Sequence, residues 1–171
     1  MNIQTNSLPE LSDSELRFFY ESISKALTNQ IINNGRPDIS ESLNILKKFY
    51  NKGNPILDIN GNLPLFGVWT PLAVTAYCNN YRALQYLIEN GADIHLAYDN
   101  MTYPLHLAAA RGNEVCIIEL LKAGADINKV DSMGKTALMR ACERTDLKRS
   151  TVELFFNTNI TKHELDLNIM L

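Results

Sequence analysis

The sequence reads YPLHLAAARG at residues 103–112, then an apolar run, then AGADIN at residues 123–128. Pro104 suits the first turn of a helix, because the N–H that a proline lacks would have no partner there. Apolar residues then recur at helical spacing, at Leu105, Ala108 and Ala109. Gly112 is expected to end this first helix.

A second amphipathic helix is predicted from the apolar run that follows. Its stripe consists of Val115, Ile117, Ile118, Leu120 and Leu121. Gly124 is expected to end this helix by taking a left-handed conformation, a common use of glycine at that place. Neither helix can bury its apolar face alone, so the two together predict a unit that packs on copies of itself.

This unit recurs with a fixed period. The same interval separates Pro71 from Pro104, Gly91 from Gly124, and Pro104 from Ala137. A constant period of about 33 residues indicates a stacked repeat array. At these residues the chain resembles the ankyrin-repeat family, whose consensus begins Thr-Pro-Leu-His-x-Ala-Ala and ends Gly-Ala-Asp-x-Asn. The resemblance implies an all-α ankyrin-repeat solenoid of stacked helix-turn-helix units with β-hairpin-like turns.

The rest of the chain is divided by this period. A long apolar stripe from Leu16 to Ile31 predicts an N-terminal helical cap over the exposed end of the array. Asn60 and Gly61 stand between two apolar runs and predict a hairpin finger five residues longer than the period allows. The expected division is the cap and a half-repeat with that finger over 1–64, repeat one over 65–97, repeat two over 98–130, a degenerate repeat three over 131–160, and a C-terminal cap over 161–171.

Several positions depart from the family pattern. Asn79 replaces the glycine between the helices of repeat one, and asparagine also accepts left-handed geometry. Met101 takes the place of the turn glycine in repeat two, and Tyr103 takes the place of its threonine. In repeat three Thr145 replaces the glycine between the helices, and the loop there has gained a residue. We therefore expect repeat three to be the least regular.

The 171-residue chain has a net charge of −3 and 20% charged residues, which is typical of an ordinary soluble protein. This charge argues against nucleic-acid binding driven by bulk charge. No apolar stretch approaches the ~20 residues that a membrane span needs. One segment, residues 129–149, has a net charge of +3, because its three acidic residues offset only half of its six basic ones. The basic residues are Lys129, Lys135, Arg140, Arg144, Lys148 and Arg149. These side chains either form a solvated rim or receive an acidic partner.

Three cysteines, Cys78, Cys116 and Cys142, fall in predicted helices at positions that face a neighbouring helix. No Cys-x-x-Cys pair is present, so we expect three packed, reduced thiols. Reduced thiols favour an intracellular setting, and residues 1–10 lack the basic and apolar regions of a secretory signal peptide. The expected location is the cytoplasm, or the interior of a host cell if the protein is a secreted effector.

The sequence offers no catalytic constellation. A cysteine nucleophile needs a base within hydrogen-bond reach and oxyanion donors, and no signature of either surrounds the cysteines. In the ankyrin family the histidine of the opening motif hydrogen-bonds locally and to the next repeat, so the resemblance implies a structural role for His106. Asp93 and Asp126 are expected to accept backbone N–H groups in the turns that follow the second helices. We predict no enzyme activity, no cofactor, no metal and no small-molecule substrate.

In the ankyrin family the turn tips and the outer side of the first helices form a concave surface that holds partner proteins. Carried onto this chain, that surface consists of Phe66, Trp69, Tyr77, Asp99, Asn100, Thr102, Arg111, Ser132, Met133, Lys135, Glu143 and Arg144. Tryptophan, tyrosine, arginine and methionine are the residues that anchor interfaces, and Trp69 is the expected main anchor. The alternative is that Phe66 and Trp69 only bury the long finger against the helices.

The expected function is a non-catalytic, monomeric protein–protein interaction module that binds a partner protein and neither nucleic acid nor membrane. A narrower version is a bacterial effector acting on a host protein, in keeping with the eroded repeats and the Asn- and Ile-rich composition. The alternative class is a substrate-recruiting segment of a larger enzyme whose catalytic domain is absent from this sequence.

Overall fold

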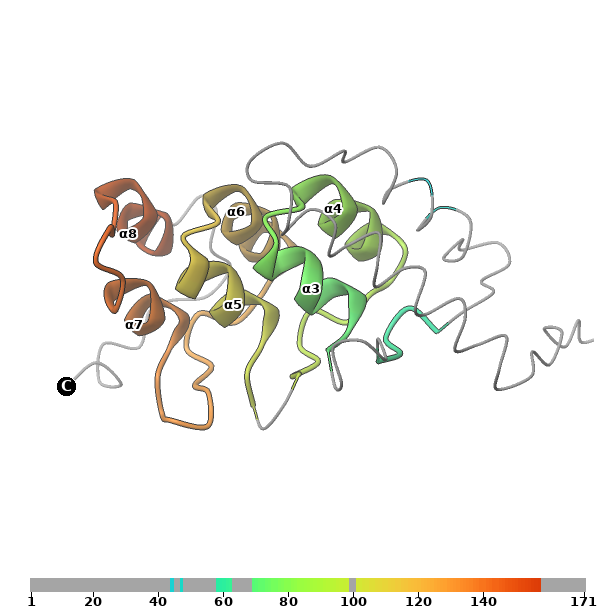
Figure 1. The fold of residues 1–171 in the computed structure, drawn as a ribbon, viewed down its shortest axis with the longest axis horizontal. Coiled ribbons are helices and arrows are strands. Elements are labelled where there is room, and N and C mark those ends of the chain that lie inside the picture. The colour runs from blue at the N-terminus through green and yellow to red at the C-terminus, as the bar shows by residue number, and fades with distance from the viewer. Residues whose placement is uncertain (1–43, 45–46, 48–57, 63–68, 99–100, 158–171) are drawn as a thin grey trace, which may run out of the picture.

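The computed structural model describes Asn44, Lys47 and residues 58–62, 69–98 and 101–157. Two layers of short helices stack side by side along these residues (Figure 1). The inner layer consists of α3 (Pro71–Tyr77), α5 (Pro104–Arg111) and α7 (Ala137–Cys142), and the outer layer of α4 (Tyr81–Glu89), α6 (Glu114–Ala123) and α8 (Arg149–Phe156). The predicted N-terminal helical cap, most of the first finger and the C-terminal cap lie outside the described residues.

The inner helices begin as the opening motif predicts. Thr70 caps α3 by accepting a hydrogen bond from the N–H of Ala73 at 3.2 Å, and Thr136 caps α7 in the same way. Such a cap satisfies one of the N–H groups that the first turn of a helix leaves without a partner. Tyr103 stands at the equivalent position before α5 and gives no side-chain cap, although Pro104 still starts that helix.

The helices end where the sequence predicts left-handed residues. Gly112 after α5 has a φ of 67°, and Gly124 after α6 has a φ of 98°. Asn79, which replaces a glycine of the family pattern, also adopts a positive φ of 61°. Met101 in the turn of repeat two has a φ of 74°, so this methionine takes the conformation of the glycine it replaces.

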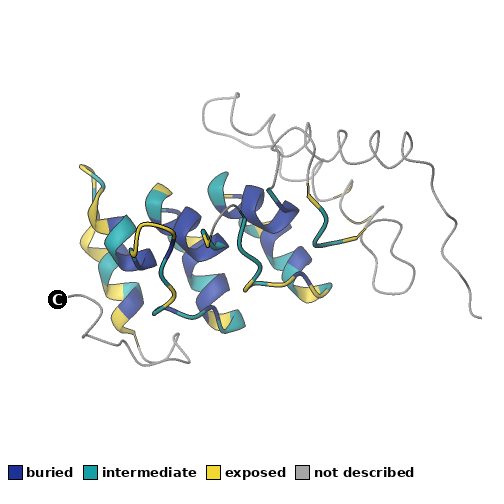
Figure 2. Ribbon diagram, turned by 90° about the horizontal axis from the view of Figure 1, so that it is seen from below, coloured by how far each residue is buried: buried dark blue, intermediate teal, exposed yellow. Residues whose placement is uncertain are grey.

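The core lies between the two layers and between neighbouring repeats (Figure 2). Helix α5 packs between α3 and α7, and its small buried residues Ala108 and Ala109 leave room for that close approach. The largest fully buried side chains come from both layers and include Leu72, Leu84, Ile117, Leu120 and Phe155. Each contributes about 1.5–3 kcal/mol relative to an exposed position, which makes the stack cooperative across repeats.

The apolar stripe predicted for α6 is partly wrong. Val115 is 43% exposed, whereas Cys116, Ile117, Leu120 and Leu121 are buried. The buried face is therefore rotated toward Cys116, whose thiol lies against α3 and the loop after it, near the backbone oxygen of Thr75 and the side chain of Asn79. A sulfhydryl behaves as a small apolar group in such a place.

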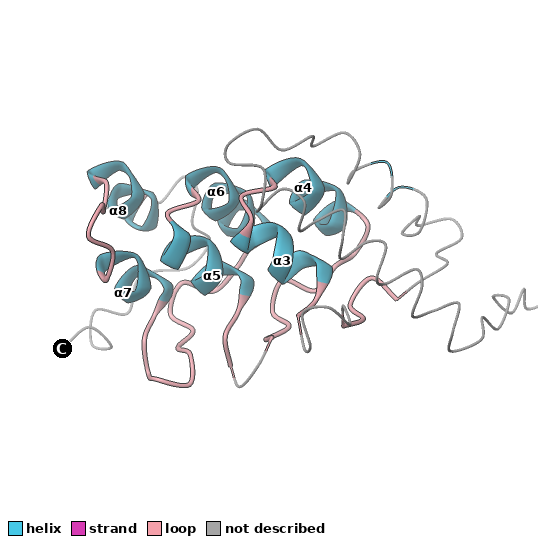
Figure 3. Ribbon diagram, viewed as in Figure 1, coloured by secondary structure: helices cyan, strands magenta, loops and turns pink. Residues whose placement is uncertain are grey.

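The turns between repeats are hairpin-like but short. Isolated antiparallel bridges join Tyr98 to Thr102 and Val130 to Thr136, and the described residues contain no longer strand (Figure 3). The Asn60–Gly61 turn is also present, since the N–H of Gly61 donates to the backbone oxygen of Asp58 at 3.0 Å. Asn60 accepts from the N–H of Asp93 at 2.9 Å, which ties the first finger to the turn that follows α4.

Repeat three departs from its neighbours in its loop. The loop between α7 and α8 covers residues 143–148, whereas the loop between α5 and α6 covers only residues 112–113. The inserted residue predicted from the sequence accounts for part of this difference. The rest arises because α7 is shorter than α5, ending at Cys142 with Glu143 in a right-handed conformation, and because α8 begins only at Arg149.

Candidate protein-binding surface

A cluster of three aromatic rings and one guanidinium spans repeats one and two. The rings of Trp69 and Tyr77 meet edge to face with centroids 5.2 Å apart, and the centroids of Trp69 and Tyr98 are 4.3 Å apart. The guanidinium carbon of Arg111 lies 4.6 Å from the centroid of Tyr77. Edge-to-face pairs and cation–π contacts at these distances are attractive. We call these four residues the aromatic cluster.

Local structure explains why the cluster forms. Trp69 immediately precedes the capping Thr70, Tyr77 is the last residue of α3, and Arg111 is the last residue of α5. Tyr98 is held by the bridge of the second turn, where its N–H donates to the backbone oxygen of Thr102 at 2.8 Å. All three rings are half-buried, while Arg111 is exposed. Trp69 is also packed against the core.

A half-open groove of about 300 Å³ adjoins the cluster at Tyr98 and lies between α5 and α7. Its lining includes Thr102, Leu107, Ala110, Arg140, Glu143 and Arg144, with His106 below them. Leu107 and Ala110 supply apolar surface from α5, and the charged residues come from α7 and the residues that follow it. The groove can therefore accept a side chain that is apolar on one side and polar on the other.

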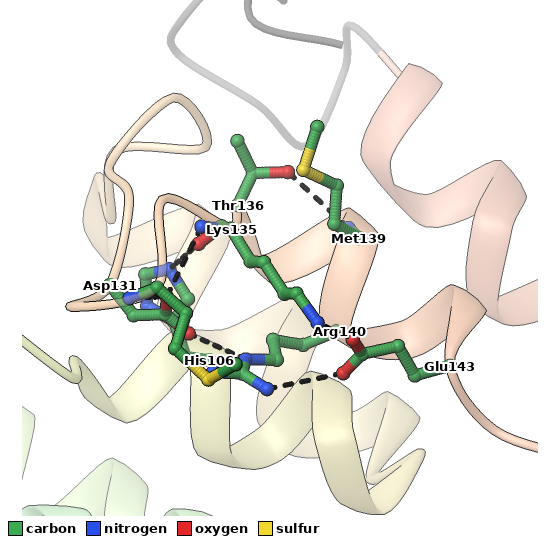
Figure 4. A network of polar contacts seen from close by, with 8 residues as sticks. His106, Asp131, Lys135, Thr136, Met139, Arg140 and Glu143 are labelled. Carbon is green, nitrogen blue, oxygen red and sulfur yellow. Dashed lines mark hydrogen bonds and ion pairs between the residues drawn. The ribbon is translucent and has the colours of Figure 1, made fainter.

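Asp131 organises the third turn beneath this groove (Figure 4). Its buried carboxylate accepts backbone N–H groups of Met133 at 2.8 Å and Lys135 at 3.1 Å. The other oxygen accepts from Nε of Arg140 at 2.5 Å. Burial alone would raise the pKa of Asp131, but Arg140 and the two N–H groups hold it below its usual value.

Glu143 extends the same network at the edge of the groove. Its carboxylate receives Nη1 of Arg140 at 3.1 Å and also pairs with the ammonium of Lys135. The hydrogen bond from Lys135 lowers the pKa of Glu143. Nε and Nη1 of Arg140 thus both donate to carboxylates of the same repeat. The network therefore fixes the turn to α7.

Arg144 joins repeat three to repeat two. Its Nη1 donates to the backbone oxygen of Ala110 at 3.0 Å, one of the carbonyl groups at the end of α5. Its Nη2 pairs with Asp146. The guanidinium also covers Gly112, where a Cβ atom would lie only 3.0 Å from Nε. Arg144 is thus a cap for the neighbouring helix as well as a groove residue.

His106 has the structural role that its motif implies. Its Nε2 lies 3.0 Å from the backbone oxygen of Lys135 in the next repeat, and the residue is only 2% exposed. Desolvation lowers the pKa of His106, although Asp131 and nearby backbone oxygens oppose that effect. The predictions for Asp93 and Asp126 are also confirmed, since their carboxylates accept the N–H groups of His95 and Asn128.

The model of a family described as "Ankyrin repeats (3 copies)" matches residues 72–166, which is more than half of the chain. The chain belongs to the ankyrin-repeat family. Ankyrin repeats are protein-binding modules, and a protein-binding solenoid is accordingly what this chain contains. The fold is similar to that of a solved structure, the ankyrin repeat domain of Bcl-3, with a TM-score of 0.58 and 22% identity, covering 69% of this chain and 48% of that one.

The curated relatives that this chain matches are much larger proteins. The chain is 30% identical over 84 residues to the E3 ubiquitin-protein ligase KEG of Arabidopsis thaliana, covering 49% of this chain and 5% of that protein. It is 39% identical over 74 residues to the human ankyrin repeat and SOCS box protein 16, covering 43% of this chain and 16% of that protein. The chain thus spans only a small part of the relatives that it matches.

The ankyrin pattern brings some of the predicted surface residues together and leaves others apart. Trp69, Tyr77 and Arg111 meet in the aromatic cluster, and Thr102, Glu143 and Arg144 line the groove, with Lys135 paired to Glu143. Ser132 and Met133 are exposed at the third turn, where the sulfur of Met133 accepts from Nη2 of Arg140 at 3.2 Å. Phe66, Asp99 and Asn100 lie outside the described residues.

The sequence interpretation left five residues of this surface off its list: Tyr98, Leu107, Ala110, Arg140 and His106, for which only a structural role was expected. The repeat period could have found one of them, because Ala110 stands one full period after Tyr77 and one full period before Glu143. Nothing in the sequence signals that Tyr98 stacks on Trp69, since that contact depends on how the second turn folds back.

The basic segment is less available than its net charge suggests. Arg140 pairs with Asp131, and Arg149 pairs with Glu153. Lys135 and Arg144 also have carboxylate partners, as described above. Lys148 is exposed, and Lys129 lies 5.7 Å from the ring centroid of Tyr103. An acidic partner spread along this segment would have to displace several existing pairs.

The cysteine predictions are confirmed in part. Cys116 is buried, but Cys78 follows the last residue of α3 and Cys142 is exposed at the end of α7. Packing of Cys142 against a neighbouring helix was therefore the wrong expectation. Burial raises the pKa of Cys78 and of Cys116 to about 12, which makes both thiols poor nucleophiles.

Within the described residues there is no group of three His, Cys, Asp or Glu side chains suited to a metal, and no helix long and apolar enough to cross a membrane.

Proposed function

We propose that this chain is a non-catalytic adaptor that holds a partner protein on its concave surface, defined as the turns before α3, α5 and α7 together with those inner helices. The observation that carries the proposal is the continuity of the aromatic cluster with the groove, joined at Tyr98. Half-buried aromatic rings offer large contact areas with little side-chain entropy to lose, which is typical of binding hot spots.

We further propose that the array is organised as residues 1–64, 65–97, 98–130, 131–160 and 161–171, with the two outer parts as caps. Caps are needed because a terminal repeat otherwise exposes an apolar face. We also propose that the module is monomeric and acts inside a cell. Its action as a bacterial effector stays a prediction.

The proposal is tested by comparing aromatic truncations on the two helix layers. Trp69→Ala removes the centre of the cluster, whereas Tyr81→Ala removes a half-buried ring of the outer helix α4 that also packs against the core. Affinity purification from cells should recover a specific partner with the wild-type chain and with Tyr81→Ala, but not with Trp69→Ala. Circular dichroism of each variant reports its helical content, because loss of capture has meaning only in a folded chain.

If Trp69→Ala stays folded and captures the same partner, the surface is assigned wrongly. If Trp69→Ala unfolds and Tyr81→Ala does not, the ring of Trp69 is needed for packing. This outcome would support the alternative in which Trp69 only buries the long finger against the helices. In that case Arg111→Glu tests the same surface without removing a packed ring, because Arg111 is exposed.

A second candidate function is substrate recruitment within a larger enzyme. It is favoured by the relatives, since the E3 ubiquitin-protein ligase KEG matches this chain over only 5% of its own length. Under this proposal the module selects a substrate and another domain carries out the chemistry. Sequencing the complete transcript would decide between the two, because an enzymatic domain in the same reading frame is required by the second and not by the first.

A further inference from the structure

Among the described arginines of the concave surface, Arg111 differs from Arg140 and Arg144. Lys135, Arg140 and Arg144 each pair with a carboxylate of their own repeat. Arg111, which stands one full period before Arg144 and occupies the same place in its repeat, is exposed and forms no ion pair within the described residues. Its guanidinium lies instead over the ring of Tyr77 at 4.6 Å.

A guanidinium held over an aromatic ring is well placed to receive a carboxylate. The ring attracts one face of the planar group, while its N–H donors point outward around the edge. The position is thus ordered before any partner arrives, so less side-chain entropy is lost on pairing. Arg144 shows the contrast, since its donors are already used by Ala110 and Asp146.

The rings beside Arg111 add an apolar platform. Tyr77 meets Trp69 and Trp69 meets Tyr98, so the chain of contacts leads from the cation to the edge of the groove. Aromatic surfaces of this kind hold proline and other apolar side chains of extended segments. The groove of about 300 Å³ has room for one further side chain next to Leu107 and Ala110.

We propose that the occupant of this surface is an extended acidic segment of a partner protein. A carboxylate of the segment pairs with Arg111, a neighbouring apolar or proline residue lies on the aromatic cluster, and the next side chain enters the groove. The inference rests on the proposed function, because it specifies what the concave surface receives. It places recognition at repeats one and two and leaves the paired cations of repeat three in their existing network.

Single-stranded nucleic acid is the other class of ligand that combines negative charge with flat groups. Nucleic-acid binding draws its affinity from several cations that neutralise phosphates. Among the described residues of this surface, only Arg111 and Lys129 lack an ion pair, they lie in separate elements over separate rings, and the net charge of the chain is −3. The arrangement therefore favours a polypeptide with a localised carboxylate.

The test uses the purified full chain and a phage-displayed library of short, unstructured random segments. Selection should enrich segments in which Asp or Glu lies within a few residues of an aromatic, aliphatic or proline residue. Synthetic peptides of the enriched sequences should bind at least about tenfold more weakly to Arg111→Glu, because the reversed charge repels the carboxylate. Their affinity for wild type should also fall as the salt concentration rises.

The matched control is Arg82→Glu. Arg82 is likewise exposed and its guanidinium lies 5.9 Å from the ring of Tyr81, but it belongs to the outer helix α4. Arg82→Glu makes the same change in net charge, so peptide affinity should stay within about twofold of wild type. Equal losses in both variants would show an effect of overall charge and would overturn the proposal.

Other outcomes separate this inference from the proposed function. Enriched peptides that are neutral or basic, and whose binding is lost in Trp69→Ala but not in Arg111→Glu, would keep the concave surface and refute the acidic occupant. Peptides unaffected by either variant, or a library that yields none, would refute both. Tighter binding of oligothymidylate than of any enriched peptide, lost in Arg111→Glu, would assign the surface to nucleic acid instead.

Discussion

Nε2 of His106 lies 3.0 Å from the backbone oxygen of Lys135, so a side chain of repeat two holds the turn of repeat three. A carbonyl oxygen can only accept, and Nε2 therefore carries the proton. The other ring nitrogen, Nδ1, is buried and has no hydrogen-bond partner among the described residues. The histidine is thus neutral in the folded chain, in agreement with its lowered pKa.

Removing this contact should destabilise the array. His106→Ala is expected to lower the free energy of unfolding by about 1–3 kcal/mol, because the oxygen of Lys135 loses its donor inside the structure. The amide of His106→Gln can reach a similar position with an N–H donor and should recover at least half of that loss. Urea unfolding of the two variants and wild type gives the comparison. Equal stability of the Ala and Gln variants would show that the hydrogen bond contributes nothing.

Stability should fall on mild acidification. The pKa of His106 is lowered from 6.5 in the folded chain, so below pH 6.5 the unfolded chain binds more protons than the folded one. The contribution of His106 is complete above pH 6.5 and is lost as the pH falls toward the folded-state value. Asp131 and Glu143, whose pKa values are also lowered, add losses only in more acidic solution.

This pH dependence is checked by thermal unfolding at a series of pH values. The melting temperature of wild type should fall between pH 6.5 and 5 more steeply than that of His106→Gln, which cannot titrate there. All other histidines are the same in both chains and cancel in the difference. Parallel curves for the two proteins would contradict the assignment.

Gly124 should tolerate asparagine but not valine. Its φ of 98° is costly for a β-branched residue, and Gly124→Val is expected to lower the free energy of unfolding by about 1–3 kcal/mol. Gly124→Asn is the control, because asparagine enters the left-handed region more readily. Loss of packing in repeat two, to which Gly124 belongs, would also uncouple repeats one and three from each other. Melting temperatures that are equal for the two variants would argue against strain at this residue.

The cysteines should differ in reactivity in the native chain. Cys142 is exposed and should react with a thiol reagent such as Ellman's reagent in the folded chain. Cys78 and Cys116, with pKa values of about 12, should stay protected until the chain unfolds. Mass spectrometry of labelled peptides identifies the sites. Cys142→Ser is the control and should abolish native labelling. Rapid labelling of Cys116 would show that α6 opens locally.

Much of the fold follows from the sequence because its signals are local. The cap of Thr70, the start of α5 at Pro104 and the left-handed end at Gly124 each depend on residues within one turn of the chain. The repeat period adds the information that similar units stack, and the resemblance to the ankyrin family implied the role of His106 toward the next repeat. The family and the stacked helix pairs could therefore be predicted without coordinates.

The candidate site depended on the tertiary structure, because its contacts join residues that no local pattern relates. Trp69 was identifiable as a member of the surface, but its half-burial results from packing between Tyr77 and Tyr98 of the next turn. Charge counting found a basic segment, whereas the fold pairs Arg140 and Arg144 with nearby carboxylates and gives Arg111 no ion pair among the residues that the structure describes. Sequence by itself determined the repeating units, since helix capping and glycine geometry act over a few residues. Which charges and rings face solvent was decided only when neighbouring repeats packed together and brought side chains a whole repeat apart into contact.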